Sequence, residues 1–261
     1  MARIARAAAL ALAALLAGCA GTEDIVSSAE VVRFLPREVA DRVSIAEFSA
    51  QRAGEAPHAP WEPYILLPSK PRTAYRLVKT DIGVALEATA ESSASGKVRK
   101  IRIEPQRHPV LEWRWRVDSL IPGADKRYAG SEDSPVRLIV SFHGDPRRLD
   151  FGARTQLRMA KALSGRALPY ATLMYVWSND LPVGTVIENP HTDRIRMIVV
   201  ASGAEGLGRW QSYRRNVVED YRAAFGEEPW DVVAVGLMTD ADNTRQSARA
   251  LYGDIAFLRA P

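Results

Sequence analysis

The chain has one cysteine, Cys19, among its 261 residues, so no disulfide can form within it. Its 35 basic and 31 acidic residues are interspersed, and no stripe of Lys and Arg is present that could follow a phosphate backbone, which excludes nucleic acid as the expected partner. The four histidines lack the His-Glu-x-x-His spacing of a zinc enzyme, and no Gly-x-Ser-x-Gly elbow occurs. Enzymatic activity is therefore left open by the sequence, with a non-enzyme favoured.

Long hydrophobic runs are also lacking. The run Ala7–Leu16 is too short to span a membrane as a helix. It follows Arg3 and Arg6 and leads through small residues to Cys19, the order that is typical of a secretory signal. Leu16-Ala17-Gly18-Cys19 resembles the lipobox of bacterial lipoproteins, in which the cysteine is acylated. An ordinary secretory signal with an incidental cysteine is the alternative.

These features predict a division of the chain into three parts. We expect a lipoprotein signal peptide over residues 1–18, a lipidated tether over residues 19–30 and a single domain over residues 31–261. The membrane is then a partner through the lipid on Cys19. Retention at the inner membrane favours Asp after the lipidated cysteine, and Ala20 stands there, so we expect an outer-membrane lipoprotein that faces the periplasm. The periplasmic face of the inner membrane is the alternative.

Short segments with strand patterns recur along the rest of the chain, separated by joints rich in Pro and Gly. They predict a mainly β protein, a β-sandwich of the jelly-roll or carbohydrate-binding-module type. Two segments with helical spacing, Phe151–Leu163 and Trp210–Phe225, predict peripheral helices. The predicted strands are Val43–Phe48, Ile82–Thr89, Val98–Ile103, Val110–Val117, Val136–Phe142, Thr172–Trp177, Arg194–Val200, Val232–Met238 and Asp254–Leu258.

The segment Leu111–Val117 alternates strictly between apolar and charged residues. Trp113 and Trp115 therefore share one face, either as sandwich core or as an exposed platform on which a sugar stacks. Leu111 and Val117 lie on the same face, which favours core. The opposite face is the candidate ligand-binding surface, with the residues Glu112, Arg114, Arg116 and Asp118.

Acidic and amide side chains crowd the region near the C-terminus. Asp240, Asp242, Asn243 and Asp254 offer the oxygen ligands that a hard cation needs, so a structural calcium ion is one interpretation. The loop lacks the Gly and the distal Glu of an EF-hand, and Asp and Asn are also common in turns, so turn chemistry is the favoured alternative. No other cofactor is expected.

Several separated motifs agree, in order, with one known family. The run from Leu111 to Asp118 and the stretches Leu168–Trp177, Arg196–Val200, Gly236–Thr244 and Tyr252–Ile255 resemble the bacterial domain-of-unknown-function family 3047. The resemblance extends from Val43 to Leu258. It implies no catalytic or binding residue, because none is established for the family.

Three functions are compatible with these patterns. The first is a non-catalytic module that binds a glycan or another ligand in the cell envelope. The second is a glycan hydrolase or lyase on the same scaffold, in which Glu112 and Asp118 or Asp240 act as acid and base; two carboxylates flanking one cleft would favour it. The third is an envelope assembly or scaffold protein, which would bind another envelope protein through an exposed apolar patch.

Overall fold

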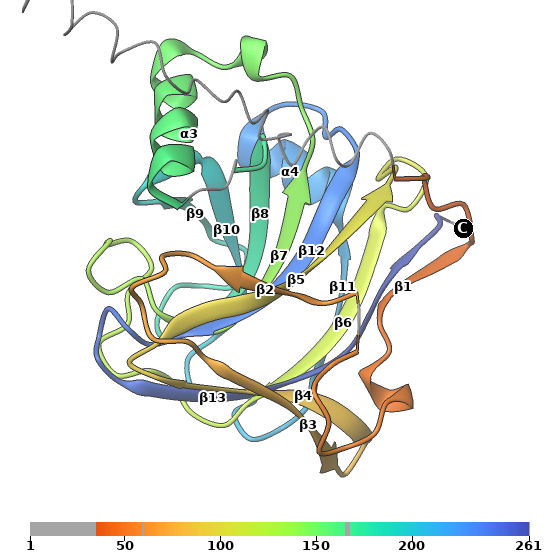
Figure 1. The fold of residues 1–261 in the computed structure, drawn as a ribbon, viewed down its shortest axis with the longest axis vertical. Coiled ribbons are helices and arrows are strands. Elements are labelled where there is room, and N and C mark those ends of the chain that lie inside the picture. Colours follow the sequence, from red (N-terminus) through yellow and green to blue (C-terminus); the bar gives the residue numbers. More distant parts are fainter. Residues whose placement is uncertain (1–34, 59, 165–167, 261) are drawn as a thin grey trace, which may run out of the picture.

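The computed structural model describes residues 35–58, 60–164 and 168–260. Their strands form a six-stranded sheet A and a seven-stranded sheet B, as Figure 1 shows. Sheet A has the order β11-β6-β13-β4-β3, with β1 paired to β13, and comprises β1 (Arg42–Ala46), β3 (Ala74–Thr80), β4 (Gly83–Glu91), β6 (Val110–Val117), β11 (Gln211–Asn216) and β13 (Ser247–Leu258). Sheet B has the order β2-β5-β12-β7-β8-β10-β9 and comprises β2 (Glu62–Ile65), β5 (Ala94–Ile103), β7 (Ser134–Phe142), β8 (Ala171–Ser178), β9 (Val186–Asn189), β10 (Thr192–Ser202) and β12 (Val232–Asp240).

The two sheets enclose one hydrophobic core in which aromatic rings from both sheets meet. Trp113 and Trp115 of β6 are buried, with 3% and 0% of their surface exposed, so the prediction that they belong to the core is confirmed. Tyr213 of β11 stacks on Trp113 with the ring centroids 5.0 Å apart, and Tyr175 of β8 approaches the same ring to 4.8 Å. Such ring pairs stabilise a core beyond the area that they bury, and here they join sheet A to sheet B.

Two helices lie outside the sheets, as predicted, but one begins later than its predicted start. Helix α3 (Phe151–Ser164) matches its prediction, whereas α4 covers only Val217–Phe225. Residues 211–216 form β11, because Tyr213 alternates with exposed neighbours and fills the core beside Trp113. The side chain of Asn216 then caps α4 by accepting hydrogen bonds from two backbone N–H groups of its first turn. No helix among the described residues is long and apolar enough to cross a membrane.

A second apolar cluster covers the outer face of sheet B. It is formed by the outward side chains of β7, β8, β10 and β12 together with residues of β5 and β9, and it lies on the far side of the sheet from the main core. Tyr64, Leu66, Leu181 and Ile195 pack against it and are partly buried themselves. Sheet B is therefore buried on both faces around these strands. The buried members of the cluster are Ala94, Ile139, Met174, Val176, Ile187, Met197, Val199 and Met238.

Candidate ligand-binding site

The residues predicted to bind a ligand lie on the outer face of sheet A. Glu112, Arg114 and Arg116 alternate along β6 with core residues, and Asp118 follows the end of the strand. Glu112 accepts a hydrogen bond of 2.9 Å from Arg214 on the neighbouring strand β11. The structure thus places the four predicted residues on one surface, the surface opposite to the tryptophans.

Ion pairs continue across this surface from strand to strand. Asp118 accepts hydrogen bonds from Arg116 at 2.8 Å and from Arg249 at 2.6 Å. Arg249 also donates to Glu87, which accepts a further bond from Arg76 at 2.5 Å. Burial alone would raise the pKa of Glu87, but the hydrogen bonds from Arg76 and Arg249 lower it. The charges of this face are paired with one another. The pair of Arg214 with Glu112 is largely exposed, and such pairs contribute little to stability, whereas Glu87 is buried.

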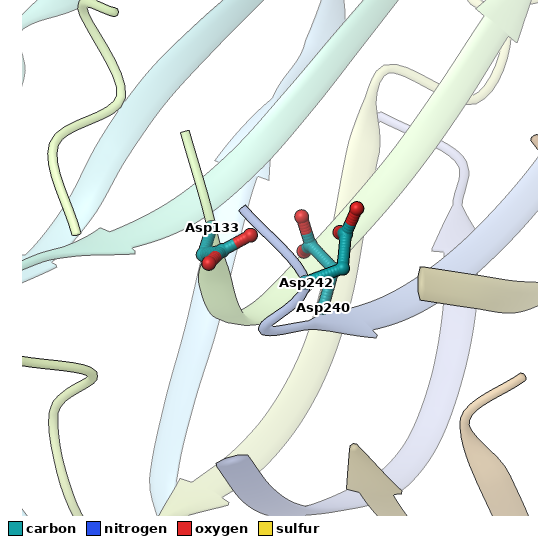
Figure 2. A group of neighbouring side chains, drawn as sticks. All are labelled: Asp133, Asp240 and Asp242. Carbon is teal, nitrogen blue, oxygen red and sulfur yellow. The ribbon is translucent and has the colours of Figure 1, made fainter. Parts of the chain in front are cut away.

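A second charged group lies on the other side of the sandwich, at one end of sheet B. Asp240 ends strand β12, Asp242 follows two residues later, and Asp133 directly precedes β7. Each of the three carboxylates offers an oxygen atom within 4.8 Å of the others. Figure 2 shows the side chains of Asp240 and Asp242 beside one another, with that of Asp133 across from them. We refer to these three residues as the aspartate cluster.

The structure brings together only part of the predicted cation site. The backbone N–H of Asn243 donates to Asp133 at 3.1 Å, so this residue is linked to the cluster through its main chain. Asp254 lies in β13, where its carboxylate accepts hydrogen bonds from the backbone N–H and the hydroxyl of Ser49. Asp254 is accordingly no member of the aspartate cluster, and Asp133 takes its place beside Asp240 and Asp242.

Each carboxylate of the aspartate cluster already has a partner of its own. Arg137 donates to both oxygens of Asp240, at 2.8 and 2.9 Å, and the exposed fraction of each side chain is 4%. Burial alone would lower the pKa of Arg137, but the Asp240 carboxylate raises it above the ordinary value. Lys70 forms an ion pair with Asp242, while Asp133 accepts hydrogen bonds from the backbone N–H and hydroxyl of Thr244. A divalent cation would have to compete with these partners.

One charged side chain beside the aspartate cluster has no hydrogen-bond partner among the described residues. Lys126 is 1% exposed, and its Nζ atom is buried without a hydrogen bond to any described residue. Burial and the nearby Arg137 guanidinium lower its pKa from 10.5 to about 8, although the carboxylates of Asp240, Asp125 and Asp133 oppose the shift. An ammonium group can donate three hydrogen bonds, and leaving them unmade in a buried place is costly.

The aspartate cluster adjoins the apolar cluster on the outer face of sheet B. Arg137 contacts both clusters, because it donates to Asp240 and its Nη1 atom lies 3.4 Å from the sulfur of Met197. The carbonyl oxygen of Glu132 accepts a hydrogen bond from Arg137. The carboxylate of Glu132 accepts a hydrogen bond of 3.1 Å from Asn189 and lies 3.0 Å from the Nε2 atom of His191. This end of sheet B therefore combines soft apolar groups with hydrogen-bond donors and acceptors, which is the composition of a small-molecule site.

Sequence analysis did not find three residues of this site: Lys126, Asp133 and Arg137. The sequence does mark Arg137, because it is the one charge in the strand segment Val136–Phe142. In the structure it lies on the same face of the strand as Ile139, and both residues are buried. A charge among buried neighbours on both faces of a strand indicates a paired interior group. Lys126 and Asp133 lie in a long loop, where no periodicity marks them.

Taken together, the two sheets, their shared core and the two outlying helices define a β-sandwich protein, which confirms the predicted fold class. The chain belongs to the DUF3047 family of proteins of unknown function, whose profile matches residues 59–256, and this confirms the resemblance seen in the motifs. No curated protein matches the sequence.

Solved structures similar to this one include an endoglucanase, a carbohydrate-binding module and an arabinofuranosidase. Endoglucanase 3 of Trichoderma harzianum, from family GH12, has a TM-score of 0.40 at 8% identity, with 85% of this chain and 100% of that chain covered. The mannan-recognising carbohydrate-binding module TmCBM27 has a TM-score of 0.31 at 10% identity, with 85% and 100% covered. The MgGH51 α-L-arabinofuranosidase has a TM-score of 0.39 at 9% identity, with 84% of this chain but only 26% of that chain covered. At these identities the likeness concerns the fold alone.

Proposed function

We propose that this protein is a non-catalytic ligand-binding module of the cell envelope, and that its ligand is a glycan or another polyhydroxylated molecule bound beside the aspartate cluster. The observation that carries the proposal is the buried, unpartnered Nζ atom of Lys126. Buried donors are almost always paired in folded proteins, and an exception calls for a functional explanation. A ligand with oxygen acceptors supplies the missing partner.

The charge of the surroundings favours hydroxyl groups as those acceptors. Five carboxylates lie near four basic groups; the acids are Asp125, Glu132 and the aspartate cluster, and the basic groups are Lys70, Lys126, Arg127 and Arg137. The charges nearly cancel, so a strongly anionic or cationic ligand would leave a charge uncompensated. A sugar hydroxyl both donates and accepts, and can therefore bond to Lys126 and to a carboxylate at once.

Access to Lys126 involves the loop between β6 and β7, which carries it. Tyr128 stands two residues further along this loop with 63% of its surface exposed. The Arg127 guanidinium lies 5.8 Å from the centre of its ring. We propose that the loop opens to admit the ligand and that the ring of Tyr128 then stacks on a sugar face.

The position of Asp240 argues against its pairing with Glu112 or Asp118 in catalysis. Glu112 and Asp118 lie on the outer face of sheet A, and Asp240 lies on the outer face of sheet B. The sandwich separates these groups, so Asp240 shares no cleft with either of them. Burial raises the pKa of Asp240, whereas its two hydrogen bonds from Arg137 favour the charged form.

Binding is tested on a glycan array with the chain from Ala20 onward, which retains every described residue. We expect saturable binding that is weakened at least tenfold, about 1.4 kcal/mol, in Lys126→Met and in Tyr128→Ala. Glu112→Gln, on the other face, is the matched control and should bind as the original chain does. The absence of saturable binding, or an equal loss in the Glu112 variant, would contradict the proposal.

The same array in calcium and in chelator tests the cation predicted from the sequence. We expect equal affinity in both, because the carboxylates near Lys126 already have basic or N–H partners. Loss of binding in chelator alone would assign a calcium ion to the aspartate cluster.

The location of the protein in the envelope rests on Cys19, which lies outside the described residues. We propose that residues 1–18 are removed, that Cys19 is acylated, and that the lipid anchors the sandwich to the outer membrane. Cys19→Ala should abolish labelling by a palmitate analogue, because its side chain offers no thiol. Labelling that persists in this variant would contradict lipidation at Cys19, and fractionation of the labelled protein distinguishes the outer membrane from the inner one.

A further inference from the structure

Helix α3 presents an unusual surface to solvent. It contains Arg154, Arg158 and Lys161 but no acidic residue. None of the three basic side chains forms an ion pair with a described residue, whereas most arginines of the sandwich do. Two large apolar side chains of the same helix are exposed, Phe151 by 76% and Met159 by 60%.

Helical spacing separates these residues into two faces. Ala153 and Leu157 point toward the sandwich and pack on its core, where the helix contacts β10. Phe151, Thr155 and Met159 fall on the opposite side, because they are displaced from the packed face by about half a turn. The hydroxyl of Thr155 donates to the carbonyl of Phe151 at 2.8 Å, so this side chain adds no unpaired polar group to the outer face. Figure 1 shows α3 at one end of sheet B, beside β9 and β10.

We propose that the outer face of α3 is a membrane-binding surface that docks on a bilayer containing anionic phospholipids. Phe151 and Met159 enter the boundary between head groups and acyl chains. Arg154, Arg158 and Lys161 lie on the flank of the helix between this face and the packed face, from which their long side chains reach the lipid phosphates. A polar helix with basic side chains beside exposed apolar ones is the pattern of an interfacial helix. The inference does not depend on the ligand proposed for sheet B.

A bilayer fits this face better than another occupant. A protein partner would bury the apolar side chains but would need acids matched to three cations on one short helix. A nucleic acid would match the cations but would leave Phe151 and Met159 against a charged backbone. An anionic membrane satisfies both groups at once, because its phosphates lie directly above its hydrocarbon.

The test is sedimentation of the chain from Ala20 onward with vesicles of phosphatidylglycerol and phosphatidylcholine in about equal amounts. We expect binding to these vesicles and much weaker binding to phosphatidylcholine alone. Replacing Arg154, Arg158 and Lys161 by Gln should reduce the partition coefficient roughly hundredfold, about a factor of five for each basic residue. The reduction should shrink as salt is added.

A second triple variant is the matched control, because it has the same net charge as the α3 triple variant. Arg72, Lys79 and Arg209 are exposed and have no ion pair among the described residues, so their triple change to Gln removes three charges elsewhere on the surface. This control should bind vesicles as the original chain does. Circular dichroism establishes that both triple variants are folded.

Three results would overturn the proposal. They are failure of the folded chain to bind anionic vesicles, equal loss in the control triple variant, and self-association without vesicles that disappears in Met159→Gln. The last result would assign the face to a second copy of the chain instead. None of them bears on the glycan array, which concerns the other end of sheet B.

Discussion

Arg137→Met is expected to lower the free energy of unfolding by about 3–5 kcal/mol. The change leaves Asp240 buried without the guanidinium that donates to both of its oxygens. It also removes the donor to the carbonyl of Glu132. Methionine itself fits the place, because its neighbours on the outer face of sheet B include Met174 and Met197. The loss therefore measures the unpaired carboxylate, and urea unfolding at neutral pH quantifies it.

The double variant Arg137→Met with Asp240→Leu is the control for this experiment. Replacing both partners of a buried ion pair by apolar side chains leaves no unpaired charge, so the loss should shrink to about 1 kcal/mol or less. A large loss of unfolding free energy in the double variant would mean that the ion pair contributes net stability, and that the cost in the single variant is more than that of an unpaired carboxylate. A loss below about 1 kcal/mol in the single variant would indicate that Lys126 moves to Asp240 and replaces Arg137.

The strands that sequence analysis missed share one position in the fold. β2 and β9 are the edges of sheet B, and β3 and β11 are the edges of sheet A. Each of the nine predicted segments overlaps a strand. Eight of these strands have a neighbour on each side and carry clear apolar patterns, whereas β1 pairs with β13 alone. Edge strands carry prolines and charges that blur the pattern, as Pro63 does in β2 and as Arg214 and Arg215 do in β11.

The candidate site was less predictable than the fold for a different reason. Asp240 and Asp242 are close in sequence, so their grouping could be expected from the loop alone. Asp133 and Lys126 reach them only because β7 pairs with β12, which brings the loop before β7 to the end of β12. Strand order within a sheet is a long-range property, and no local pattern in this chain encodes it.

Lys126→Met is expected to raise the free energy of unfolding at pH 7 by about 3–4 kcal/mol. The pKa of Lys126 is about 8 in the folded protein and 10.5 as its ordinary value, a difference of roughly 2.5 pH units at about 1.4 kcal/mol each. At pH 7 the folded state therefore bears the full cost of the buried charge. The gain in stability should accompany the loss of ligand binding, which is the usual relation between a strained functional group and the fold that holds it.

The pH dependence of the unfolding free energy distinguishes removal of a buried charge from better packing of the methionine side chain. The folded state binds fewer protons than the unfolded state between about pH 8 and 10.5, so the stability of the original chain should rise across that interval. Tyr75 and Tyr252 act in the opposite sense above about pH 10, because burial raises their pKa values and stabilisation is lost as the unfolded tyrosines ionise. Urea unfolding between about pH 7 and 9.5 isolates the lysine. Lys126→Met should have a flat profile there, and an unchanged slope in this variant would show that another group titrates.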